Sequence, residues 1–362
     1  MAWRVEAGRR GGDALAPFRR PPAVVWPVAA FVLWTLVSIP FSTDVLRSAV
    51  EVKGLLTFLL VPVAGALLIA SEDVRLLVNL WRLTALYLVL RGLVEFLATG
   101  GGLEARLRAG LSVHMTYAGL VMVFTLLLLG RALSAAEPRA SRLLDAIVAA
   151  AGFLAVAFTL TRNAYLGLAA GLVALALAKK PRAALVLVPA AVLLLLISPA
   201  SVRSRALSTF DPADETARDR LAMWKAGDLM VRDHPWTGVG PGRISPLYQE
   251  YRQPGYVMPK VGHLHGNVVT LAAETGIPSA IFYLAFVGTF FIGAVRRLRH
   301  PGPDPLRPVV EGAAAAMAGL FAAGFFEYNF GDVEVLIPTL VLSVVPFLRA
   351  GGRETRSVEP AG

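Results

Sequence analysis

The chain contains no cysteine and little charge. Its 362 residues include no Cys, which excludes disulfides, thiolate metal sites and a cysteine nucleophile. Only 17% of the residues are charged, whereas 56% are hydrophobic and the mean hydropathy is +0.62. A soluble domain needs more charge to cover its surface, so this composition predicts a membrane protein.

The sequence also lacks the short alternating segments of a membrane β-barrel. Instead it repeats apolar runs of about 17–25 residues, each long enough to cross a hydrocarbon core of about 30 Å as a helix. We therefore expect an all-α, polytopic bundle of about ten transmembrane helices. The expected spans are 22–40, 54–70, 76–98, 112–132, 143–160, 163–179, 183–199, 267–295, 309–327 and 334–348.

The net charge of +10 is not gathered into one basic surface, which argues against a nucleic-acid partner. The positive residues lie between apolar runs, and the positive-inside rule then puts both termini in the cytoplasm of a bacterial inner (plasma) membrane protein. The clusters expected inside are Arg4, Arg9, Arg10, Arg19 and Arg20, then Arg131, Arg139 and Arg142, then Lys179, Lys180 and Arg182, then Arg296, Arg297, Arg299 and Arg307, and finally Arg349, Arg353 and Arg356.

This topology gives one long periplasmic connection. We expect a basic cytoplasmic arm at 1–21, helices 1–7 over 22–199, a periplasmic loop at 200–266 between helices 7 and 8, helices 8–10 over 267–348, and a cytoplasmic tail at 349–362. The loop should hold an amphipathic helix at 215–232 and a Gly/Pro-rich turn at 238–242. Because unusually long loops tend to be functional, we expect the chemistry on the periplasmic face.

Arginines are the first candidate site residues. Arg162 lies in a tight turn at the outer membrane boundary, where it either snorkels or caps a helix, or clamps a phosphate or carboxylate with its fork of donors. Arg218 and Arg220 lie in the loop, near aromatic residues such as Tyr248. They bind an anionic ligand, or they pair with neighbouring acidic residues and lipid headgroups.

Two histidines, His263 and His265, come just before the helix expected at Asn267. Three interpretations compete: a zinc site, a structural histidine, and a general base that takes a proton from a hydroxyl. A zinc site needs a third ligand, for which His114 and His234 are the other outward histidines. We favour the general base, and we expect no metal and no cofactor.

Acidic residues face the same side. Glu274 is either a functional group or a structural carboxylate. As a structural carboxylate it would pair with Arg162 or with a loop arginine. A further acidic turn joins the last two helices, and its polar residues are expected to be mainly solvated. These residues are Glu327, Asn329, Asp332 and Glu334.

The order of several short motifs resembles the O-antigen ligase and polymerase superfamily (WaaL and Wzy type). The motifs are Thr161-Arg162, Arg220-Leu221-Ala222-Met223-Trp224, Pro235-Trp236-Thr237-Gly238-Val239-Gly240, and His265 followed by Glu274-Thr275-Gly276, and the resemblance covers roughly residues 145–345. It implies a GT-C-like fold and an inverting, metal-independent transfer of a glycan from undecaprenyl pyrophosphate to an acceptor sugar hydroxyl. The acceptor would be lipid A core for a ligase and another lipid-linked glycan for a polymerase.

The resemblance also implies roles for single residues. His265 would be the general base, and Arg162 and Arg220 would bind the donor pyrophosphate. The expected supporting residues are His263, Asn267, Glu274, Arg218 and Tyr248. Because Gly266 stands between the histidine and Asn267, where the family usually has Asn directly after the histidine, either His263 or His265 is the base.

Two other classes of function remain open from the sequence. A transporter or flippase of lipid-linked saccharides would use the same arginines without making a bond, and a structural membrane subunit would need none of them. Transporters more often show repeated halves and a polar site at the membrane midplane. Here the ionisable residues gather at one face, which favours an enzyme.

Overall fold

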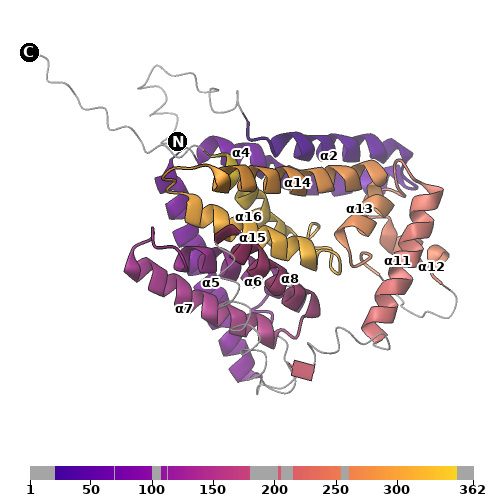
Figure 1. Ribbon diagram of the computed structural model, residues 1–362. Coiled ribbons are helices and arrows are strands. Elements are labelled where there is room, and N and C mark those ends of the chain that lie inside the picture. The colour runs from indigo at the N-terminus through magenta and orange to yellow at the C-terminus, as the bar shows by residue number, and fades with distance from the viewer. Residues whose placement is uncertain are drawn as a thin grey trace, which may run out of the picture.

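The computed structural model describes residues 21–68, 70–99, 107–111, 113–179, 203–204, 215–253 and 261–348. Within them the regular secondary structure is helical, as the sequence predicted, and the long helices run side by side (Figure 1). The helices are α2 (Val25–Ser38), α3 (Val45–Glu51), α4 (Leu60–Leu67), α5 (Ser71–Ala98), α6 (His114–Ala132), α7 (Arg139–Phe158), α8 (Arg162–Lys179), α11 (Glu215–Asp233), α12 (Ile244–Tyr251), α13 (Asn267–Thr275), α14 (Ile277–Arg299), α15 (Arg307–Ala323) and α16 (Val333–Val344), with 3-10 turns η2 (Ile39–Phe41), η3 (Val52–Leu59) and η5 (Val345–Phe347).

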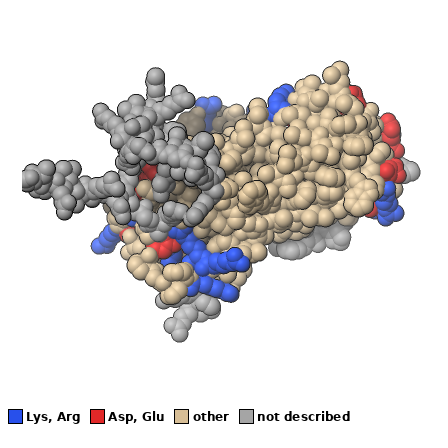
Figure 2. All heavy atoms as spheres, turned by 90° about the horizontal axis from the view of Figure 1, so that it is seen from above, with Lys and Arg blue, Asp and Glu red and all other residues tan. Residues whose placement is uncertain are grey.

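Five helical segments are long and apolar enough to cross a membrane: Val45–Leu67, α5, α6, α7 and α14. Large apolar side chains such as Leu76, Leu83 and Leu177 are exposed on the outer helices. On the face shown in Figure 2 the charged side chains gather mainly toward the two ends, and the broad middle is almost uncharged. These features are typical of a multi-pass membrane protein.

The expected spans fit the helices unevenly. Those at 76–98, 112–132, 143–160 and 163–179 coincide within a few residues with α5 to α8, and the amphipathic helix expected at 215–232 is α11. The span at 183–199, the tail at 349–362, nearly all of the arm at 1–21 and parts of the loop at 200–266 lie outside the described residues. The ten-helix count is therefore untested.

The expected span at 267–295 was wrong as a single helix. The helix breaks at Gly276, whose φ of 85° lies in the left-handed region that glycine tolerates. Pro278 then stands at the start of α14, where its missing N–H costs nothing. As a result α13 is a separate short helix, which packs against α11 and α14.

Helix α15 lies at the centre of the bundle and packs against α6 and α8. Glycines make these contacts close. A Cβ atom on Gly130 of α6 would collide with the backbone of Gly312 on α15, and one on Gly167 of α8 would collide with the carbonyl oxygen of Gly319. Small residues at helix crossings allow this close packing in membrane proteins, where the hydrophobic effect between helices is weak.

The bundle has two distinct ends. We call one the loop end: it is formed by α11 to α13, by the starts of α6, α8, α14 and α16, and by the ends of α7 and α15. The opposite end holds buried or partly buried ion pairs. They are Arg131 with Glu137, Lys179 with Glu311, and Arg297 with Asp304.

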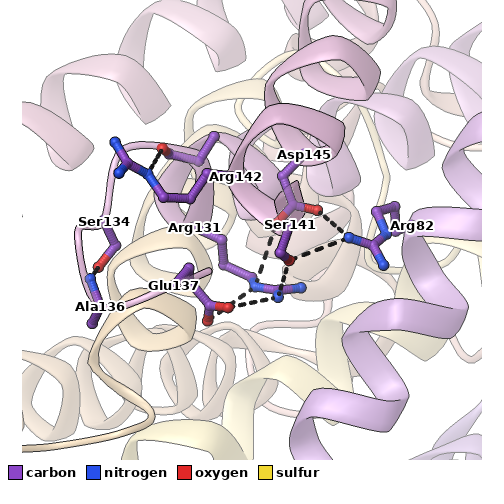
Figure 3. Close-up of polar contacts among 9 residues, drawn as sticks. Arg82, Arg131, Ser134, Ala136, Glu137, Ser141, Arg142 and Asp145 are labelled. Carbon is purple, nitrogen blue, oxygen red and sulfur yellow. Dashed lines mark hydrogen bonds and ion pairs between the residues drawn. The ribbon is translucent and has the colours of Figure 1, made fainter. Parts of the chain in front are cut away.

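The largest of these ion-pair clusters ties α5, α6 and α7 together (Figure 3). Asp145, which is completely buried, accepts a hydrogen bond from Arg82 Nη1 at 3.2 Å and lies 3.5 Å from Arg131 Nε. Arg131 Nη2 also donates to Glu137 at 3.0 Å. Two arginines thus face two carboxylates, so the cluster is neutral only while all four are present.

Asp145→Asn is expected to lower the free energy of unfolding by about 3–5 kcal/mol, because it leaves an uncompensated buried arginine. Arg139→Gln, at an exposed position at the start of the same helix, is the matched control and should change stability by less than about 0.5 kcal/mol. Thermal unfolding in detergent micelles measures both. Equal melting temperatures for the two variants would contradict the role of the cluster.

Candidate active site

The loop end is held together by a backbone clamp between two distant segments. Val239 N–H donates to the Ala273 carbonyl at 2.9 Å, Gly240 N–H to Glu274 at 2.8 Å, and Ile277 N–H to Pro235 at 2.9 Å. A Cβ atom on Gly276 would collide with the carbonyl oxygen of Trp236. Two of the motifs noted in the sequence, 235–240 and 274–276, therefore form one structural unit that fixes α11 beside α13.

Glu274 belongs to this clamp. Its Oε1 accepts a hydrogen bond from the Gly242 N–H at 3.1 Å, a different partner from the arginines considered for it in the sequence. Burial raises the pKa of Glu274 to about 7, although this hydrogen bond partly opposes the shift. The side chain supports the position of the loop.

A cavity of about 230 Å³ opens at the loop end, and we call it the arginine cavity. Arg162 enters it from the start of α8, Arg220 from α11, and His265 from the turn before α13. The structure thus brings these three predicted residues around one space. The complete lining is His114, Met115, Leu160, Thr161, Arg162, Asn163, Thr216, Asp219, Arg220, Met223 and His265.

Two lining residues have an unusual backbone. Leu160 has a φ of 54° and His265 a φ of 50°, both in the left-handed region that residues with a Cβ rarely adopt. Leu160 makes the sharp turn that lets α8 begin at Arg162. Such strain persists only where the surroundings enforce it, and it is often found at functional sites.

His265 is held on three sides. Its carbonyl oxygen accepts from Trp224 Nε1 at 3.4 Å, and its own N–H donates to His263 Nδ1 at 3.2 Å. Its ring Nδ1 lies 3.2 Å from Glu327 Oε2. With Nδ1 engaged by the carboxylate, Nε2 is the ring nitrogen left for a ligand in the cavity.

Glu327 was expected in a mainly solvated turn, and this was wrong: only 8% of the residue is exposed. Burial alone would raise its pKa, but the hydrogen bond with His265 and the nearby charges of His265 and His263 hold the pKa below its ordinary value. The pKa of His263 is also lowered, because burial outweighs the attraction of Glu327. An ionised Glu327 thus lies between two histidines.

Asn267 positions the turn that carries Glu327. Its amide nitrogen donates to Asn329 Oδ1 at 2.8 Å, and its amide oxygen accepts from the Phe330 N–H at 3.0 Å. The Asn267 N–H also donates to the Gly324 carbonyl at 2.7 Å. Asn267 therefore stabilises the turn next to the site, and its side chain does not line the arginine cavity.

A second cavity of about 400 Å³ adjoins the first and shares Met115 and Asn163 with it. We call it the acidic cavity. Its polar lining is Thr116, Asn163, His263, Glu327, Tyr328, Asn329, Asp332 and Glu334. His265 therefore faces the arginine cavity, while its partner Glu327 lines the acidic one.

Two predicted supporting residues lie away from both cavities. Arg218 is exposed on α11, and it lines neither cavity. Tyr248 is buried with Met223, Met230 and Ile244 in a small hydrophobic core of the loop itself. Arg218 therefore contacts solvent, and Tyr248 stabilises the fold of the loop.

A third metal ligand beside His263 and His265 was expected, if a metal site existed, at His114 or His234. The structure places Glu327 there instead: ligand atoms of His263, His265 and Glu327 lie within 4.8 Å of one another. This spacing would allow all three to reach one metal ion. In their present arrangement the groups contact each other directly, through the hydrogen bond between His265 and Glu327.

Comparison with known proteins bears on the same region. No curated protein matches the chain. The model of the O-antigen ligase family matches residues 147–284, which include Arg162, Arg220, His263 and His265. The part of the chain that carries Arg162, Arg220 and His265 is therefore similar to the O-antigen ligase family.

Proposed function

We propose that the protein is a membrane glycosyltransferase that moves a glycan from undecaprenyl pyrophosphate to a hydroxyl of an acceptor saccharide, with inversion at the anomeric carbon and without a metal. The observation that carries the proposal is the grouping of Arg162, Arg220 and His265 around one cavity, within the region that matches the O-antigen ligase family. Two guanidinium groups and one imidazole suit an anionic leaving group and a hydroxyl nucleophile.

The arginines bind the donor pyrophosphate. Arg162 is 7% exposed, and at that burial its attraction for a phosphate is screened less than it would be in water. A guanidinium offers paired donors that match phosphate oxygens. As the glycosidic bond breaks, negative charge grows on the leaving pyrophosphate, and the two arginines stabilise it.

His265 activates the acceptor. Its Nε2 takes the proton of the acceptor hydroxyl, and the hydroxyl oxygen forms the new bond to the anomeric carbon. The bond between that carbon and the pyrophosphate oxygen breaks, and undecaprenyl pyrophosphate leaves with the electron pair. The products are the elongated acceptor and the free lipid pyrophosphate, with the proton on His265 until solvent removes it.

The acceptor approaches through the acidic cavity, and its reacting hydroxyl enters the adjoining arginine cavity, which His265 lines. Inversion requires the hydroxyl to attack from the side opposite the leaving group, so donor phosphates and acceptor occupy neighbouring spaces. The two cavities adjoin at Met115 and Asn163, and the carboxylates of Asp332 and Glu334 would repel a pyrophosphate from the second one. Carboxylate, amide and tyrosine side chains suit the hydroxyls and rings of a sugar.

The location we propose is the outer face of a bacterial inner membrane, with both termini in the cytoplasm. Lys179, Arg296, Arg297, Arg299 and Arg307 lie at the end opposite the site, and excess positive charge marks the cytoplasmic side of membrane proteins. A GT-C-like bundle with its site at one membrane surface would let the lipid-linked donor enter laterally from the bilayer.

The test is transfer by the purified protein in proteoliposomes, with labelled undecaprenyl-pyrophosphate glycan and EDTA. Supplying lipid A core or a second lipid-linked glycan as acceptor separates ligase from polymerase, because the new bond lies in a different product. A new glycosidic bond of inverted configuration supports the proposal. Movement of the labelled lipid between leaflets with no new bond to either acceptor would instead assign a flippase.

A further inference from the structure

We infer that Glu327 is the positioning residue for His265, fixing the ring tautomer that leaves Nε2 free to accept a proton. The inference rests on the proposed role of His265 as the base. It concerns a residue outside the matched region of 147–284.

The hydrogen bond decides where the proton of His265 lies. Its Nδ1 is 3.2 Å from Glu327 Oε2, and an ionised carboxylate can only accept. The neutral imidazole must therefore carry its proton on Nδ1 to make this bond. Its lone pair is then on Nε2, as a general base requires.

His263 completes the arrangement. Its Nδ1 accepts the His265 N–H at 3.2 Å, so in the neutral ring the proton is on Nε2. That Nε2 lies 3.5 Å from Glu327 Oε1, the other oxygen of the same carboxylate. One carboxylate thus orients both histidines, and it gives them opposite tautomers.

The carboxylate is itself fixed. Its Oε1 accepts a hydrogen bond from the Tyr328 N–H at 3.2 Å, and Asn267 holds the following residues against the start of α13. Glu327 lines the acidic cavity and not the arginine cavity. It therefore acts on the reaction through His265 and stabilises the imidazolium formed when His265 takes the proton.

The geometry separates the two histidines. His265 lines the arginine cavity with Arg162 and Arg220, whereas His263 lines only the acidic cavity. The proton that His263 carries on Nε2 also prevents that nitrogen from acting as a base. The arrangement assigns the base to His265 and a supporting role to His263.

Kinetics of Glu327→Gln and Glu327→Asp test the inference. Gln keeps the size but removes the charge and can present its NH₂ group to Nδ1, so kcat should fall about 100-fold or more, while the KM for the lipid-linked donor changes less than about threefold. Asp keeps the charge on a shorter side chain and should recover part of kcat. Glu250→Gln, at an exposed site on α12, is the control and should behave as wild type.

A second readout is independent of transfer. The chain has five histidines, so ring-¹⁵N labelling gives few signals, and a His265→Gln sample identifies those of His265. Wild type and Glu327→Asp should show His265 protonated on Nδ1 at pH 8, and Glu327→Gln should shift it toward the Nε2 form. If wild type shows this tautomer but makes no glycosidic bond, the proposed function fails while the positioning of His265 stands.

Three results would overturn the inference. One is a His265 tautomer that does not change in Glu327→Gln, and another is a kcat for that variant within threefold of wild type. The third is metal analysis of the purified protein that finds one tightly bound ion per chain, lost in both Glu327→Gln and His263→Ala. His265 Nδ1 would then be a metal ligand and not a hydrogen-bond donor.

Discussion

His265→Ala is expected to slow glycan transfer by about 10²–10⁴-fold, the usual contribution of a positioned general base. The KM for the lipid-linked donor should change by less than about threefold, because the two arginines that bind the pyrophosphate remain. Initial rates in proteoliposomes over a range of donor concentrations separate kcat from KM. The variant retains the backbone clamp at 235–240 and 274–276, so it is expected to fold.

Two comparisons make the His265 result specific. His300→Ala, an exposed histidine at the opposite end of the bundle, should have wild-type rates. His263→Ala should lose activity by a smaller factor, about tenfold, since it weakens the support of His265 without removing the base. A loss in His263→Ala that equals or exceeds the loss in His265→Ala would contradict the assignment.

Arg162→Ala is expected to lower kcat/KM for the donor by about 10²–10³-fold, the range seen when one group that stabilises transition-state charge is removed. Part of the loss should appear in KM, because the arginine also contacts the bound pyrophosphate. Arg162→Lys should recover only a fraction, since an ammonium cannot make the paired hydrogen bonds of a guanidinium. Rates at several donor concentrations measure both effects.

Arg220→Ala should have a similar effect because Arg220 lines the same cavity. Arg232→Ala is the control: it lies on the same helix, is 71% exposed at its side chain and pairs with Asp228. If Arg162→Ala and Arg232→Ala had the same donor KM and kcat, the arginine cavity would not be the pyrophosphate site.

The sequence predicted the arginine and histidine of the site for a simple reason. Alternating helices bring every second connection to the same end of a bundle, so Arg162 in one turn and His265 in another had to share one end. The motif at 235–240 could be recognised in the sequence, but its structural role could not. Its pairing with 274–276 depends on a left-handed glycine whose neighbour is far away in sequence.

The burial of Glu327 was not predicted, because a turn between two helices normally faces solvent. Asn267, at the start of α13, forms hydrogen bonds with Asn329 and Phe330. These bonds hold the turn that contains Glu327 against the bundle. The break of the expected span at Gly276 was missed for a related cause. Apolar stretches lie on both sides of the break at residue 276, and hydropathy alone does not reveal a single residue with positive φ.

The buried charges at the opposite end also escaped prediction. Arg131 was expected at the cytoplasmic end of the span at 112–132, but its burial was not predicted: it is 2% exposed and bonded to Glu137. Loop arginines and buried arginines look alike in sequence, because the difference depends on whether a carboxylate from a neighbouring helix reaches them.

A structure of the His265→Ala variant with its lipid-linked donor bound is the most direct test of the central claim, since the donor should bind and remain uncleaved. We expect the pyrophosphate between Arg162 and Arg220, with the anomeric carbon facing the space vacated by the imidazole. A pyrophosphate bound away from both arginines, at any other place on the protein, would contradict the account.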